Sequence, residues 1–245
     1  MDAIRPLLSQ ARSFNNGAGK PAPFNTMSRA FVVGNGVSLN ATDLEKMMGE
    51  TVFCVNGIAK IYPRTKFRPT HYVRAEEAST NSNPSVYRSD MEIHRDLGCE
   101  IWANEYFIRE SDGIRNSGNY RQIRSCAHYG MHFDNPDTPH LFHLPRLCTF
   151  GSSVNVAIQI ALGIMNIDKV YLVGCDMGYK DGGGNHFCDD YTDGLGELRS
   201  ARLNELDILA SHMICARSFP NRIYNATVGG SLEVYERVKY ESLFT

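Results

Sequence analysis

The chain has 245 residues, of which 42% are hydrophobic and 21% charged, as is typical of a folded globular protein and not of a disordered or fibrous one. Its 25 basic and 27 acidic residues nearly cancel, so the net charge does not support a general affinity for nucleic acid or an anionic membrane surface. The seven cysteines are odd in number and never stand in a C-x-x-C pair, which argues against a disulfide framework or a zinc knuckle. We therefore expect a protein of the reducing cytoplasm.

The first residues lack the pattern of a signal peptide, and no apolar run approaches the length of a membrane span. Residues 1–27 are rich in glycine, proline and asparagine, which predicts a flexible N-terminal arm. We expect residues 28–245 to form a single domain.

Three apolar, β-branched runs follow the arm, and each stops abruptly at a polar turn. The runs are residues 30–33, 51–55 and 70–73. This repeated order of buried strand and polar turn predicts a parallel sheet. Ligands of such sheets bind outside the carboxyl ends of the strands. The edge that binds a ligand would be lined by Asn35, Asn56 and Arg74 or Glu76.

The middle of the chain is less regular. Residues 90–97 predict a helix and residues 100–103 a further strand, which carries the single tryptophan, Trp102. From about 105 to 147 arginine, asparagine, tyrosine and histidine alternate without a period, so we expect an irregular inserted segment. Its histidines stand close to prolines where no helix is expected, and we predict no metal site there.

Regularity returns with a Gly-Ser-Ser turn at 151–153, which precedes an apolar helical stripe over residues 154–162. Backbone N–H groups and hydroxyls at the start of a buried helix favour an anion. A buried strand over 170–173 comes next. After a further helix at 195–217 and a short strand at 222–224, residues 232–243 predict a terminal amphipathic helix.

The strand at 170–173 runs into a loop that collects titratable side chains. They are Asp176, Tyr179, Asp181 and His186. Asp176 could cap or brace this loop and Tyr179 could simply pack, but their place after a buried strand favours a ligand site.

Several of these segments together resemble the bacterial CMP-sialic acid sialyltransferases. They resemble equally the related domain of flagellin motility-accessory-factor glycosyltransferases and the 6-hydroxymethylpterin diphosphokinase-like proteins. The segments are 34–38 (G-N-G-V-S), 52–56 (V-F-C-V-N), 151–153 with 161–163, and 169–176 (K-V-Y-L-V-G-C-D). The likeness covers residues 30–75 and 148–235. It implies an α/β fold with a Rossmann-like, mostly parallel sheet flanked by helices, like the nucleotide-binding domain of GT-A glycosyltransferases.

The resemblance implies an inverting glycosyltransferase that needs no cofactor. It would transfer a sugar from a nucleotide-activated donor, such as a CMP-linked nonulosonic (sialic) acid, to a glycan or another hydroxyl acceptor. His186 would be the general base and Tyr179 would hydrogen-bond the departing phosphate, and we place Asp176 with them. The nucleotide and donor sugar would contact Gly34, Asn35, Gly36, Asn56, Gly151, Ser152 and Ser153. The substrate would also contact Arg74, Asp181 and Asn225.

Only K-D-G-G-G-N separates Tyr179 from His186, a spacing closer to the motility-accessory and pterin-kinase branch. A diphosphokinase acting on 6-hydroxymethyl-dihydropterin is therefore an alternative, in which Asp176 and Asp181 would hold Mg²⁺. A non-catalytic nucleotide-binding module is a third hypothesis. The sequence is compatible with a homo-oligomer but does not indicate one.

Overall fold

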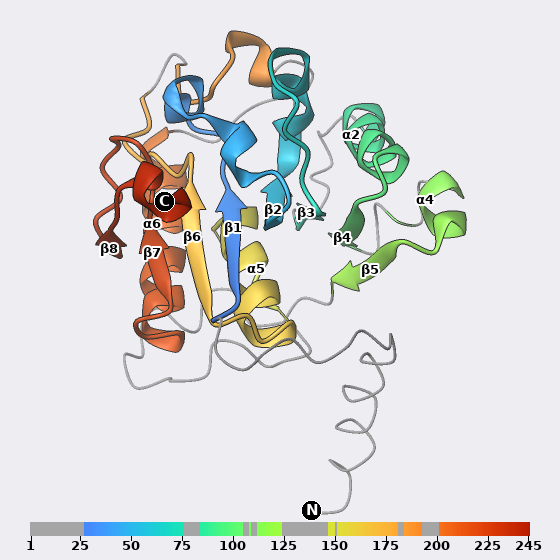
Figure 1. Ribbon diagram of the computed structural model, residues 1–245. Coiled ribbons are helices and arrows are strands. Elements are labelled where there is room, and N and C mark those ends of the chain that lie inside the picture. The colour runs from blue at the N-terminus through green and yellow to red at the C-terminus, as the bar shows by residue number, and fades with distance from the viewer. Residues whose placement is uncertain are drawn as a thin grey trace, which may run out of the picture.

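The computed structural model describes residues 27–75, 84–104, 108, 112–123, 147–149, 151–180, 184–192 and 201–245. Within them the chain forms one eight-stranded sheet, parallel throughout and flanked by helices (Figure 1). The strands are β1 (Arg29–Val33), β2 (Thr51–Val55), β3 (His71–Arg74), β4 (Glu100–Asn104), β5 (Tyr120–Ile123), β6 (Lys169–Val173), β7 (Ile223–Asn225) and β8 (Glu236–Arg237). This confirms the α/β, Rossmann-like architecture.

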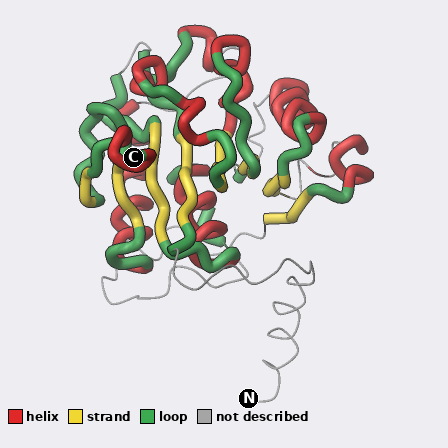
Figure 2. The backbone as a smooth tube through the Cα atoms, viewed as in Figure 1, coloured by secondary structure: helices red, strands yellow, loops and turns green. Residues whose placement is uncertain are grey.

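The connections combine α-helices with short 3₁₀ turns. The α-helices are α2 (Pro84–Asp96), α4 (Asp112–Ser117), α5 (Ser153–Gln159) and α6 (Ala201–Ser218), and α5 continues into a π-helical turn, η4 (Ile160–Ile164). The 3₁₀ segments are η1 (Val37–Ala41), η2 (Leu44–Met47), η3 (Asn56–Arg64), η5 (Asp189–Thr192) and η6 (Tyr240–Phe244). Figure 2 shows short helical turns and loops gathered above the carboxyl ends of the central strands.

Two apolar cores lie on opposite faces of the sheet, because successive strand side chains point to opposite sides. In β1, Phe31 and Val33 contribute to one core, which also contains residues of η1, η2, η3 and α2. Ala30 and Val32 contribute to the other core, which is covered by α5 and α6. All four side chains are fully buried, as expected for a central parallel strand.

The strand order is β5-β4-β3-β2-β1-β6-β7-β8, so the chain moves outward from β1 through β2 to β5 and then returns to the other side of β1. The direction of strand addition therefore reverses between β1 and β6. Open parallel sheets bind ligands outside the carboxyl ends of the strands at such a switch point. The loops after β1 and β6 are those in which the sequence predicted a site.

Two predicted elements differ from the structure. Residues 232–243 do not form one helix: they contain β8 and part of η6. Leu232 packs in one core and Tyr240 in the other, so the segment crosses the edge of the sheet rather than following one face. Within the segment 105–147, expected to be irregular, residues 112–123 include α4 and β5, and β5 extends the sheet beside β4.

The predictions for the N-terminal arm up to residue 26, for Asp181 and for residues 124–146 lie outside the described residues. In the part of the chain that the structure describes, no helix is both long enough and apolar enough to cross a lipid bilayer.

Candidate functional site

The loops after β1 and β6 lie side by side and are joined by backbone hydrogen bonds. The N–H of Gly34 donates to the carbonyl of Val173 at 2.8 Å, and the N–H of Gly36 donates to the carbonyl of Gly174 at 2.9 Å. The pairing of β1 with β6 therefore continues past the ends of both strands. A side chain at Gly34 would place its Cβ 2.5 Å from the Gly174 carbonyl oxygen, so this approach requires glycine.

The carboxylate of Asp176 fills the turn after β1. Its Oδ2 accepts hydrogen bonds from the Ser38 hydroxyl at 3.0 Å and from the Ser38 N–H at 3.3 Å. A Cβ at Gly36 would lie 1.5 Å from the same oxygen. Burial raises the pKa of Asp176, and the hydrogen bonds from Ser38 oppose that shift. The Asp176 carboxyl group thus occupies the place where a glycine-rich turn could receive a phosphate.

Asn35 connects three segments at this edge. Its Nδ2 donates to the carbonyl of Val55 at 3.0 Å, and its own carbonyl accepts from the N–H of Phe187 at 3.1 Å. Its Oδ1 is buried and has no hydrogen-bond partner in the described part of the chain. One of the two N–H donors of the side-chain amide is therefore already used within the protein.

Asn56 begins the turn after β2 in the left-handed region, with φ at 52°. Its carbonyl accepts a hydrogen bond from the hydroxyl of Tyr72 at 2.9 Å. The next N–H, of Gly57, donates to the Tyr191 hydroxyl at 3.2 Å. Asparagine tolerates this backbone conformation better than most residues, so the side chain at position 56 is compatible with a turn that two tyrosines hold.

His186 lies between aromatic rings. Its imidazole stacks on Tyr191 with ring centroids 3.9 Å apart and planes 6° from parallel. Tyr179 meets it edge to face at 6.3 Å and 76°. Burial lowers the pKa of His186 to about 4, so the ring is neutral at pH 7. The structure brings together His186 and Tyr179, two members of the expected catalytic set.

Tyr179 belongs to the loop that carries Asp176, and it is mostly buried. Its pKa is raised to about 12, first by burial and then by Cys175, Asp176 and Glu205. The phenol therefore keeps its proton at neutral pH and remains a hydrogen-bond donor. Glu205 also accepts a hydrogen bond from the N–H of Gly178 at 2.8 Å, which fixes this loop against α6.

The Gly-Ser-Ser turn at 151–153 starts α5 as the sequence predicted. The Ser152 hydroxyl caps the helix by accepting from the N–H of Val154 at 3.1 Å. Gly151 has a φ of 81°, and its close approach to Ser211 and the Asp207 carbonyl leaves no room for a side chain. Ser153 is 5% exposed, and its hydroxyl has no partner among the described residues.

Arg74 is 3% exposed and lies beside Tyr72 and Asp90. Burial raises the pKa of Asp90 to about 6, and the positive charges of Arg74 and Lys60 oppose this shift. Tyr72 in turn stacks on His94 with centroids 3.8 Å apart. In this arrangement Arg74 belongs to a buried polar cluster behind the Asn56 turn and is almost inaccessible from outside.

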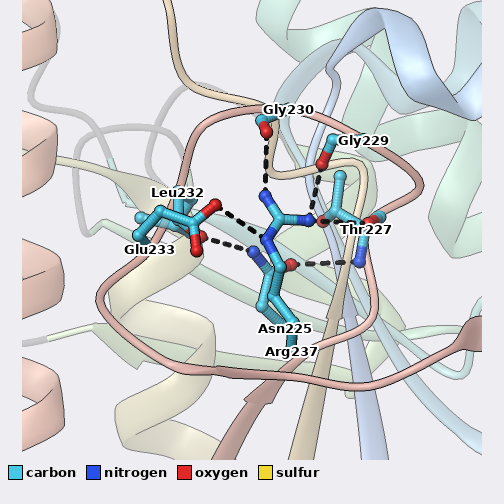
Figure 3. A network of polar contacts seen from close by, with 7 residues as sticks. All are labelled: Asn225, Thr227, Gly229, Gly230, Leu232, Glu233 and Arg237. Atoms are coloured by element: carbon cyan, nitrogen blue, oxygen red, sulfur yellow. Dashed lines mark hydrogen bonds and ion pairs between the residues drawn. The ribbon is translucent and has the colours of Figure 1, made fainter.

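Asn225 is fully buried, and both ends of its amide are used within the loop that follows β7 (Figure 3). Nδ2 donates to the carbonyl of Leu232 at 2.7 Å, and Oδ1 accepts from the N–H of Thr227 at 3.0 Å. This leaves the side chain no accessible group for a substrate. Its role in the structure is to brace the loop, which differs from the expected contact.

Arg237 holds the same loop from its other side. Its guanidinium donates to the carbonyls of Gly229 and Gly230, both at 2.8 Å, and its Nε donates to Glu233 at 2.9 Å (Figure 3). The loop lies against Asp176, whose carbonyl accepts from the N–H of Ser231 at 2.6 Å. The loops after β1, β6 and β7 therefore form one connected wall.

Four residues that organise the site were not assigned a role from the sequence. They are Ser38, Tyr72, Tyr191 and Arg237. Ser38 stands in the segment that carries the resemblance, but nothing in the sequence pairs it with Asp176. Tyr72 and Tyr191 carry no signal in the sequence, since only the fold brings their hydroxyls to the Asn56 turn.

No cluster of three or more histidine, cysteine, aspartate or glutamate side chains suited to a metal ion occurs among the described residues, which do not include Asp181. Comparison of the chain with protein-family models, with curated proteins and with solved structures found no match.

Proposed function

We propose that this chain is a glycosyltransferase that uses a nucleotide-activated sugar and inverts the configuration at the transferred carbon. The observation that carries the proposal is a neutral imidazole beside a protonated phenol at the switch point of a parallel sheet. His186 supplies the imidazole and Tyr179 the phenol. Nucleotide ligands are frequent at this place in such sheets.

His186 accepts the proton of the acceptor hydroxyl in this proposal. An imidazole with a pKa near 4 is a weak base in the empty site. A donor phosphate bound nearby raises the pKa of the ring, because a negative charge favours the imidazolium. The base therefore becomes stronger when the donor is present, and its proton transfer is worth about 10²- to 10⁴-fold in rate.

Tyr179 donates a hydrogen bond to the departing nucleotide phosphate, where negative charge grows as the glycosidic bond breaks. Its raised pKa suits this role, because the phenol does not ionise near neutrality. The geometry favours the Asn56–Gly57 turn over the 34–36 turn as the nucleotide contact, since Asp176 already fills the latter.

A thermal-shift screen tests the binding half of the proposal. The full chain is heated with CMP, UDP and GDP, and with nucleotide sugars of each base, with and without Mg²⁺. A ligand at 100 times its Kd stabilises the native state by about 2.7 kcal/mol, which is a shift of several degrees for a chain of this size. Absence of any shift across the panel contradicts the proposal.

Turnover of the donor that binds best tests the catalytic half. His186→Gln is expected to lower kcat by about 10²- to 10⁴-fold and Tyr179→Phe by about 10-fold or more, with melting temperatures near wild type. Asp189→Asn and Tyr224→Phe are the matched controls, because both side chains are partly or fully exposed and lie outside the proposed machinery. If the chain binds a nucleotide and His186→Gln causes no loss of function, the protein is instead a non-catalytic nucleotide-binding module.

The diphosphokinase alternative predicts a different metal response. It requires Mg²⁺ held by Asp176 and Asp181, so EDTA would abolish its activity. In the structure, Oδ2 of Asp176 already accepts two hydrogen bonds from Ser38. We expect transferase turnover to persist in EDTA.

A further inference from the structure

Tyr191 contacts both the turn after β2 and the loop that carries His186. Its ring lies 3.9 Å from the imidazole of His186 and nearly parallel to it, while its hydroxyl accepts the N–H of Gly57 at 3.2 Å. The side chain is 8% exposed, and Phe187 packs against it edge to face at 5.7 Å. One rigid side chain on η5 therefore spans the distance between the turn after β2 and the histidine loop.

The position of Gly57 is shaped by the same ring. A Cβ at Gly57 would lie 3.1 Å from one Tyr191 ring carbon and 3.3 Å from another, so a side chain there would push the ring away. The carbonyl of the preceding residue, Asn56, is held by Tyr72 at 2.9 Å. The turn is thus fixed on one side by Tyr72 and on the other by Tyr191.

The imidazole of His186 has no hydrogen bond to any residue in the part of the chain that the structure describes, although a base is usually oriented by a third group. Stacking on Tyr191 is the contact that fixes its plane. We propose that Tyr191 is a positioning residue, which orients the His186 ring and links it to the nucleotide-binding turn at Gly57. The inference rests on the proposed function for its kinetic consequences, but the orientation itself can be measured without a substrate.

Among the described residues, no charged group shifts the pKa of His186, and burial alone lowers it. Among the described residues, the titratable groups that face the ring are the phenols of Tyr179 and Tyr191, and Arg64 of η3 lies over the ring of the neighbouring Phe187. On the adjoining elements, Lys60 of η3 is paired with Asp190 of η5 at 3.2 Å, and Asp176 is hydrogen-bonded to Ser38. Because burial is the cause of the lowered pKa, removing the stacked ring should admit water and raise it.

The first experiment follows the His186 imidazole by NMR between pH 8 and 5.5 in the full chain, with the signal assigned by its absence in His186→Gln. In wild type we expect the signal to remain at its neutral position. In Tyr191→Leu we expect it to titrate within this range, because the pKa rises from about 4 toward the ordinary histidine value near 6.5. In Tyr191→Phe, which keeps the ring, we expect no titration in this range.

The second experiment examines the link to Gly57. Tyr191→Phe removes only the hydroxyl, so we expect the Gly57 amide to exchange with solvent at least about tenfold faster while neighbouring amides of β2 are unchanged. This near-isosteric variant also keeps the inference testable if Tyr191→Leu does not fold. Unchanged exchange at Gly57 in Tyr191→Phe, or an unchanged His186 titration in folded Tyr191→Leu, overturns the inference.

Kinetics then separate positioning from a merely structural role. With a working donor, Tyr191→Leu should lower kcat by about 10- to 100-fold, and its pH profile should move with the pKa of His186. Tyr191→Phe should keep kcat and raise the KM for the donor. If wild type turns over no donor, the proposed function fails, but the NMR and exchange results still decide whether Tyr191 orients His186.

Discussion

Two halves of the carboxyl edge of the sheet use their polar groups in opposite ways. The glycine-rich half consists of residues 34–38, 174–178 and 225–231, and the aromatic half consists of residues 56–57 with Tyr72, Tyr179 and 184–191. In the first half, backbone N–H groups, carbonyls and the Asp176 carboxylate bind one another. In the second, rings bury His186 without occupying its nitrogens in hydrogen bonds to any described residue.

This difference shows what a glycine-rich turn does and does not indicate. Glycines 34 and 36 are required because two loops approach each other closely, not because the backbone must remain open to a phosphate. In the function proposed above, the chemistry comes instead from His186 and Tyr179, both of which burial keeps neutral at pH 7. Single substitutions can disrupt either half, or show whether the two halves are independent.

The largest effect is expected from Gly36→Ala. Its φ of −71° suits alanine, so the cost comes from the Cβ that would lie 1.5 Å from Asp176 Oδ2. We expect a loss of about 3 kcal/mol or more in the free energy of unfolding, measured by urea denaturation. Adding Asp176→Ala should restore part of the lost stability. It removes the atom at 1.5 Å, and the nearest remaining atom is the Gly174 carbonyl oxygen at 2.8 Å. Gly113→Ala is the control, since only the mobile end of Arg95 stands in its way.

Asn225→Ala tests the third loop of the glycine-rich half. It leaves the Leu232 carbonyl and the Thr227 N–H without their partner in a fully buried place, which should cost about 2 to 3 kcal/mol. Tyr224→Phe, whose lost hydroxyl bond to the Asn221 carbonyl is exposed, should cost under about 0.5 kcal/mol. Equal losses in the two variants would mean that the buried amide is not a brace.

His94→Gln tests the packing beneath the aromatic half, through the pH dependence of the free energy of unfolding. Burial lowers the pKa of His94 to about 4, below its unfolded value of about 6.5, so its contribution is full above pH 6.5 and is lost as the pH falls. Asp90, whose pKa is raised to about 6, contributes with the opposite sign. The gap in unfolding free energy between wild type and His94→Gln should narrow by about 1.4 kcal/mol per pH unit from pH 6 to 5. A gap that does not change with pH contradicts this assignment.

The smallest effect is expected from Arg237→Met. Its guanidinium bonds to loop carbonyls are largely exposed, so their loss should cost about 1 kcal/mol. The amide of Ser231, which donates to the Asp176 carbonyl, should nevertheless exchange faster with solvent. Lys239→Met is the exposed control, and His186 should titrate as in wild type if the two halves are independent.

The central strands could be predicted from the sequence because each is an apolar, β-branched run with a sharp end. Residues 51–55 form β2 as predicted, and β1, β3 and β6 differ from prediction by one residue. β5 was missed because Tyr120–Ile123 places polar side chains on an exposed edge strand and buries only Ile123 fully. Burial on both faces leaves a pattern in the sequence, whereas an edge strand leaves little.

The helix predicted over residues 232–243 was wrong for a different reason. Leu232 and Tyr235 pack in one core and Tyr240 in the other, so the apolar spacing reflects two faces of the sheet. Asn225 also donates to the carbonyl of Leu232, which would otherwise accept a helical hydrogen bond. Such side-chain bonds join residues that sequence patterns do not pair.

That polar residues after the buried strands meet at one edge of the sheet could be predicted, because the strands are parallel. The roles within it could not, because Asn35 and Asn56 look alike in sequence. Asn35 donates one hydrogen bond from its side chain to the Val55 carbonyl, while Asn56 begins a turn held by two tyrosines. The Ser38–Asp176 contact spans 138 residues and exists only after folding.

The two edges of the sheet bear on how copies of the chain can associate. β8 has two exposed residues, Glu236 and Arg237, and β5 is four residues long with Arg121 paired to Glu100 at 3.0 Å. Short, charged edge strands resist the addition of a strand from a second molecule. Continuation of the described sheet from one molecule into another is therefore disfavoured. The same edges protect the parallel sheet from self-templated aggregation at high concentration.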